Sequence, residues 1–156
     1  FALWGHILFG PLALALAPFQ LNGRLRAGRP GLHRWLGRVY GLAILIAGLS
    51  ALALVPTSIA STFARAGFVA LALSWIGTTA WGISRAMRGD RVAHRRWMLR
   101  SIALTFGAVT LRVYMAPLMA AGWTVAQTYD LTAWGCWVPS LIVLELWQRR
   151  RAMVPA

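Results

Sequence analysis

The stretch that decides the fold is residues 35–55, WLGRVYGLAILIAGLSALALV, in which no charged side chain follows Arg38. An α-helix crosses the hydrocarbon core of a bilayer with about 20 predominantly apolar residues, because each residue adds about 1.5 Å. Four other stretches have the same character. The sequence therefore predicts an all-α, polytopic transmembrane helix bundle in a single domain, with spans at 2–20, 35–55, 66–87, 97–121 and 131–147.

The composition agrees with a membrane protein and disfavours a soluble one. Apolar residues make up 59% of the 156 residues, charged residues only 12%, and the mean hydropathy is +0.63. All 16 basic residues are Arg, against three acidic residues, which gives a net charge of +13. Because the arginines lie in clusters between apolar runs, not on one face of a polar fold, we expect no nucleic-acid partner.

The positions of the arginines predict the orientation of the spans. Fourteen of the 16 lie in residues 24–38, 85–100 and 149–151, which five alternating spans place on one side of the membrane. The positive-inside rule assigns that side, with the C-terminus, to the cytoplasm of a bacterial inner membrane. Phe1 would then lie outside, so we expect one further span upstream. The tract 22–34, rich in Gly and Arg, is expected to be a loop.

Two cytoplasmic boundaries resemble each other. Residues 33–38 read HRWLGR and residues 94–100 read HRRWMLR. This echo suggests two parallel, duplicated helix hairpins related by an axis along the membrane normal. Alternatively, the same interfacial anchor arose twice.

The two histidines are the best candidates for holding a cofactor. Histidines on neighbouring helices can ligate haem b axially, and arginines can pair with its propionates or with a lipid headgroup. A quinone is a further possibility. The candidate set is His33, His94, Arg34, Arg38, Arg96 and Arg100. The alternative is that each histidine only forms hydrogen bonds between helices. No motif predicts a metal site of the zinc type.

Two charged residues fall inside predicted spans. Arg112 is near the middle of the fourth span, where an unpaired Arg is costly, so we expect it to face the bundle interior. Glu145 is one turn from the cytoplasmic surface, and Arg149 or an arginine of the cytoplasmic loops suits it better than Arg112. At the outer side, Asp130 is expected to pair with Arg65.

Several motifs together resemble the domain-of-unknown-function 2306 family of predicted bacterial integral membrane proteins. They are the two histidine motifs, His6 with Gly10-Pro11, Gln20 after Pro18-Phe19, Ala103-Leu104-Thr105-Phe106, Val109-Thr110-Leu111-Arg112 and Glu145. The resemblance covers nearly the whole chain. It implies a helical membrane protein with one more span upstream, and it implies no particular activity.

Three classes of function remain open. The sequence contains no pattern of a nucleophile with a base, no paired carboxylates and no phosphate loop. It therefore predicts no catalytic residue, and an enzyme is disfavoured. The favoured interpretation is an accessory subunit that packs against a larger respiratory or photosynthetic membrane complex, or an oligomer. The alternatives are a haem- or quinone-binding redox protein and a small transporter that uses Arg112.

Overall fold

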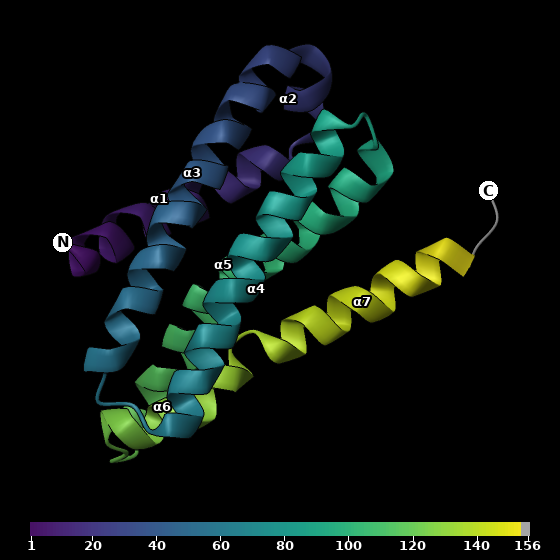
Figure 1. Ribbon diagram of the computed structural model, residues 1–156. Helices are drawn as coiled ribbons and strands as arrows, with labels where there is room; N and C mark the ends of the chain where they lie inside the picture. The colour runs from purple at the N-terminus through teal and green to yellow at the C-terminus, as the bar shows by residue number, and fades with distance from the viewer. Residues whose placement is uncertain (154–156) are drawn as a thin grey trace.

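The computed structural model describes residues 1–153, and this part of the chain contains helices and no strand. Four helices are long and apolar enough to cross a membrane, the second of them together with a short 3-10 turn, η1. The elements, shown in Figure 1, are α1 (Ala2–Leu21), α2 (Gly23–Gly28), α3 (Pro30–Leu54), η1 (Val55–Thr57), α4 (Thr62–Met87), α5 (Arg91–Ala120), α6 (Val125–Gly135) and α7 (Val138–Met153).

The two helices that carry the histidine motifs begin about one turn before the apolar stretches themselves. Pro30 occupies the first position of α3, where its missing N–H costs nothing. The Asp90 carboxylate caps α5 by accepting the backbone N–H of Ala93 at 2.9 Å. Consequently His33 and His94 are each the fourth residue of their helix, at equivalent positions.

The predicted fifth span is not one continuous helix, so the count of five spans is corrected to four long helices and a broken one. The helix α6 ends at Gly135 and α7 begins at Val138. Pro139 has no N–H to donate to the Gly135 carbonyl, which interrupts the helical hydrogen bonds there. In Figure 1, α7 leaves the bundle as an arm that contacts α5 and α6.

The expected loop at 22–34 is also partly helical. The Asn22 side chain accepts the backbone N–H of Leu25 at 3.0 Å and so caps the six-residue helix α2. Pro30 then begins α3 at once. The loop prediction was wrong because Asn22 is as good a helix cap as a turn residue.

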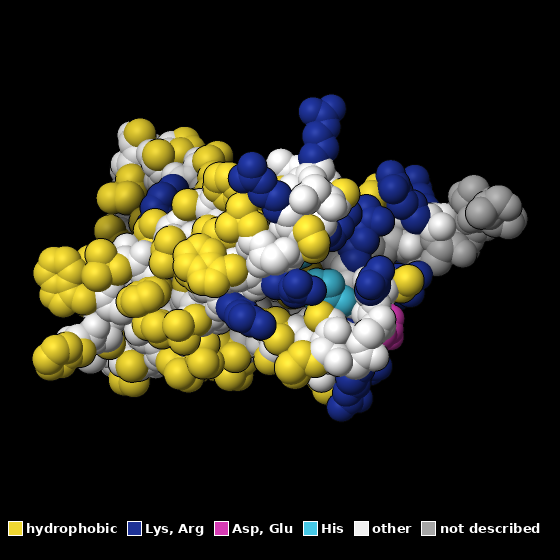
Figure 2. Space-filling view, turned by 90° about the horizontal axis from the view of Figure 1, so that it is seen from above, with side chains coloured by type: hydrophobic (Ala, Val, Ile, Leu, Met, Phe, Trp, Pro, Cys, Tyr) yellow, Lys and Arg dark blue, Asp and Glu magenta, His cyan; other side chains and the backbone are white. Residues whose placement is uncertain are grey.

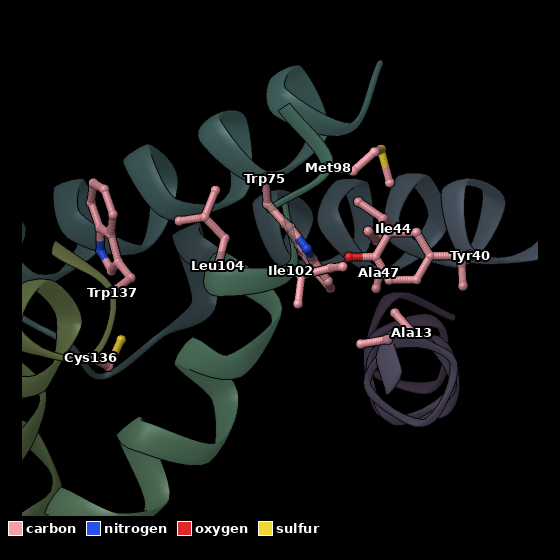
Figure 3. Close-up of a cluster of buried hydrophobic side chains, with 12 residues drawn as sticks. Ala13, Tyr40, Ile44, Ala47, Trp75, Met98, Ile102, Leu104, Cys136 and Trp137 are labelled. Carbon is pink, nitrogen blue, oxygen red and sulfur yellow. The ribbon is translucent and has the colours of Figure 1, made fainter. Parts of the chain in front are cut away.

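Small residues allow the long helices to pack closely. Ala13 and Ala17 of α1 are completely buried against α3, which contributes Ala43 and Ala47. The α3 and α4 helices also pack closely, because a Cβ on Gly48 would lie 2.7 Å from the Ile76 side chain. The resulting core, drawn in Figure 3, runs along the junction of α1, α3, α4 and α5.

A chain of buried hydroxyl groups joins α3, α4 and α5 within this core. The Tyr40 hydroxyl lies 2.9 Å from both Ser101 Oγ and Thr105 Oγ1. The Trp75 indole N–H donates to Thr105 Oγ1 at 2.9 Å, and Thr79 Oγ1 lies 2.7 Å from Ser101 Oγ. Polar groups at membrane depth need partners inside the protein, so this network fixes how the three helices face each other.

Candidate functional site

The arginine-rich end of the bundle holds the candidate site. The arginine-rich end comprises α2, the first turns of α3 and α5, and the last turns of α4 and α7. Figure 2 shows most of the basic side chains gathered over one part of the surface, with hydrophobic side chains covering the rest of that face. His33 and His94 both lie at this end.

His94 fastens α5 to α4. Its Nδ1 lies 2.8 Å from the carbonyl oxygen of Gly82, and donation to that carbonyl leaves the lone pair of Nε2 free. A Cβ on Gly82 would lie 2.8 Å from the Met98 sulfur, so the Met98 side chain packs directly against the α4 backbone here. This contact is the alternative role that the sequence left open for a histidine.

His33 differs from His94 because its inward nitrogen has no partner. His33 Nδ1 and Gln20 Nε2 are both buried atoms without a hydrogen bond. Gln20 is in the last turn of α1 and lies against Gly37, one turn after His33, since its Oε1 is 3.2 Å from where a Gly37 Cβ would be. His33 and His94 occupy equivalent positions of α3 and α5, at the same end of the bundle. The structure therefore groups Gln20, His33 and His94 in one region.

The four candidate arginines divide into two kinds. Arg34, Arg38 and Arg96 are exposed around the rim. Arg100 instead forms a two-pronged ion pair with Glu145, Nε to Oε1 at 2.5 Å and one terminal nitrogen to Oε2 at 2.9 Å. Its guanidinium carbon is also 4.5 Å from the centre of the Trp97 ring. Arg100 is thus occupied in holding α7 to α5, and the partner of Glu145 is neither Arg149 nor Arg112.

Two expectations about the other charged residues were wrong. Arg112 does not face the bundle interior: it is exposed, and its guanidinium donates to the Ala108 carbonyl of its own helix at 2.7 Å. The neighbours of α5 simply do not reach this face. Asp130 does not pair with Arg65, because it accepts the Ser61 hydroxyl while Arg65 donates to the Ser58 carbonyl at 2.5 Å.

A cleft between α5 and α7 was not foreseen. Its volume is about 300 Å³, and it is lined by Arg91, Val92, Arg95, Arg96, Leu99, Trp147, Gln148 and Arg151. The spacing of Arg91 and Arg95, four residues apart on one helix face, is a signal that sequence reasoning could have used. No pattern in the sequence predicts that α7 approaches α5 and forms the other wall of the cleft.

Comparison with known proteins identifies the family of the chain but no activity, ligand or partner. The family model described as "Predicted membrane protein (DUF2306)" matches residues 3–148. No curated protein and no solved structure matches the chain. The match includes both histidine motifs, the Arg100–Glu145 pair and all four long apolar helices. The chain therefore belongs to the domain-of-unknown-function 2306 family of membrane proteins.

Proposed function

We propose that this protein is a noncatalytic accessory subunit that binds another membrane protein through the outer half of α5, residues 106–120. The observation that carries the proposal is the exposure of Arg112 on a helix that is otherwise apolar in this half. The exposed neighbours of Arg112 are Val109, Val113 and Tyr114. A surface of this kind is complete only when another polar group meets the guanidinium.

The depth of Arg112 makes lipid a poor partner for it. Twelve residues separate Arg112 from Arg100, and eight separate it from Ala120, which is about 18 Å and about 12 Å along the helix. The guanidinium is directed back towards Ala108, away from the outer end of α5. An Arg at such a depth costs about 2.5–3.5 kcal/mol on insertion scales unless it finds a partner.

The chemistry of the partner follows from the acidic residues of this chain. Glu145 is paired with Arg100, Asp90 caps α5 near Arg85, and Asp130 accepts the Ser61 hydroxyl at the far end. A second copy therefore brings no carboxylate to the depth of Arg112. We propose a different membrane protein whose helix carries Asp or Glu at that depth, and a larger respiratory or photosynthetic complex is the expected setting.

The proposal includes the orientation of the protein. The arginine-rich end and the end of α7 would face the cytoplasm of a bacterial inner membrane, because most of the basic side chains lie there. The outer half of α5 would then meet its partner in the outer leaflet.

Photo-crosslinking tests the proposed interface. A crosslinking amino acid at Val113 in the full chain should capture one membrane protein, and capture should fall at least tenfold in Arg112→Leu but persist in Arg112→Lys. Val92, exposed at the opposite end of α5, is the matched control position. Exclusive crosslinking to a second copy, or equal capture in Arg112→Leu, would contradict the proposal.

A second candidate function, a membrane redox protein with haem b or a quinone, is supported by the unpartnered nitrogens. Two imidazoles with free nitrogens on α3 and α5 suit axial ligation, and the Gln20 amide and His33 suit the carbonyl oxygens of a quinone. A reduced-minus-oxidised spectrum of the purified protein decides the haem arm. A Soret change abolished by His33→Ala and His94→Ala supports haem, and its absence from the intact chain excludes it.

A further inference from the structure

The cleft between α5 and α7 has the charge of an anion site. Arg91, Arg95 and Arg96 reach it from the first turns of α5, and Arg151 reaches it from α7. No acidic side chain lines it, and the nearest acid in sequence to its α7 wall, Glu145, is occupied by Arg100. The Arg151 guanidinium lies over the Trp147 ring, 4.3 Å from its centre, and is held in place by that contact. The planar guanidinium group of Arg can donate two hydrogen bonds to the oxygens of one phosphate.

Gln148 supplies the second, independent observation. It lines the cleft yet is only 8% exposed, and its Oε1 is a buried acceptor without a donor. The opposite assignment of its amide is disfavoured, because Nε2 faces the Arg96 carbonyl oxygen at 3.4 Å. A phosphate, which has only acceptors to offer here, cannot satisfy Oε1. A hydroxyl group next to the phosphate can, once rotation of the Gln148 side chain brings the buried Oε1 to the wall of the cleft.

The surroundings of the cleft are those of a lipid headgroup site. Trp147 marks the level at which aromatic residues meet the membrane surface. One turn before it on α7, Val143 is exposed on the same side as Trp147 and offers apolar surface to an acyl chain. Leu99 continues this apolar wall on the α5 side. Basic pockets between helices at the cytoplasmic surface are suited to anionic headgroups.

We infer that this cleft binds the headgroup of an anionic phospholipid that carries a free hydroxyl beside its phosphate, as phosphatidylglycerol does. The arginines hold the phosphate, and Gln148 Oε1 accepts the hydroxyl. An ethanolamine headgroup also offers a donor, but its ammonium group is repelled by four guanidinium groups. The site lies at the opposite end of α5 from Arg112, so it does not depend on the proposed partner interface.

Lipid binding to the purified full chain in nanodiscs tests the inference. The probes are phosphatidylglycerol, phosphatidylethanolamine and phosphatidylmethanol, the last having the same charge as phosphatidylglycerol but no hydroxyl. One retained phosphatidylglycerol per chain is expected. Arg95→Gln with Arg96→Gln should weaken its binding about tenfold or more, the effect of losing charge-assisted hydrogen bonds. Arg24→Gln with Arg29→Gln removes two exposed arginines outside the cleft and should have little effect.

Gln148→Met tests the hydroxyl contact separately. It should leave phosphatidylmethanol binding unchanged while the preference for phosphatidylglycerol over phosphatidylmethanol falls about fivefold, the loss of one hydrogen bond. Three results would overturn the inference: an equal loss when Arg24 and Arg29 are replaced, displacement of the lipid by millimolar inorganic phosphate, and no preference for phosphatidylglycerol in the intact chain. The first would show unspecific charge attraction, and the second a site for free phosphate.

Discussion

The two halves of α5 solve the problem of polar groups in a membrane in opposite ways. The inner half, residues 91–105, buries Ser101 and Thr105 and satisfies both through Tyr40, Trp75 and Thr79. The outer half, residues 106–120, exposes most of its side chains, and its one charged residue has no partner beyond its own backbone.

The difference shows which half of α5 has its polar side chains satisfied within the protein and which half does not. In the inner half, α4 lies against α5 and the Tyr40 side chain reaches α5 from α3, so the hydroxyl groups of Ser101 and Thr105 find partners within the protein. In the outer half the helix presents an apolar surface that lipid can cover, with one guanidinium that lipid covers poorly. The inner half is therefore expected to hold the bundle together, and the outer half to meet something else.

The largest expected effect comes from removing the centre of the inner network. Tyr40→Ala should lower the free energy of unfolding by about 3–5 kcal/mol, because it leaves a cavity and strips Ser101 and Thr105 of a shared partner. Tyr114→Ala, an exposed tyrosine of the outer half, should change it by less than about 0.5 kcal/mol. Denaturant unfolding in detergent micelles measures both. Equal losses at the two positions would break the comparison.

A smaller effect isolates the hydroxyl group itself. Tyr40→Phe keeps the ring and removes only the oxygen that lies 2.9 Å from Ser101 and Thr105, so we expect a loss of about 1 kcal/mol. Tyr114→Phe should cost nothing measurable in the same unfolding assay. If the two variants have the same free energy of unfolding, the hydrogen bonds of the buried network orient the helices without stabilising the fold.

The smallest effect on stability belongs to the residue that matters most for the proposed partner. Arg112→Leu in the isolated protein should change the free energy of unfolding by no more than about 0.5 kcal/mol, since the side chain is exposed and its hydrogen bond is to its own helix. The same variant is expected to lose the crosslink at Val113. A loss of stability above about 2 kcal/mol would instead make Arg112 a structural residue of this bundle.

Part of this architecture could be predicted because it depends on local composition. Runs of about 20 apolar residues specify long helices wherever they occur, and Arg clusters mark their ends, so the all-α bundle and its arginine-rich end followed from the chain alone. The break between α6 and α7 was also readable, from Gly135 and Pro139, but a hydropathy pattern that stays apolar through both residues hides it.

The candidate site was predicted only in part for a physical reason. The placement of His33 and His94 at one end follows from their equivalent positions in two helices that begin on the same side. Which nitrogen is occupied does not, because it depends on whether a carbonyl such as that of Gly82 comes within reach. No sequence pattern marks Gln20 or Gln148 as a ligand, because only the packing leaves an atom of each amide buried without a partner.

By itself the sequence determined that this is a helical membrane protein with its arginines at one end, because hydrophobic length and charge act residue by residue. Only the tertiary structure decided which helix faces meet. The packing of these faces placed the Tyr40 hydroxyl next to Ser101 and Thr105 and paired Arg100 with Glu145. It also left the Arg112 side chain exposed. Such contacts join residues as many as 65 positions apart, so they depend on how the helices rotate against each other and not on any local pattern.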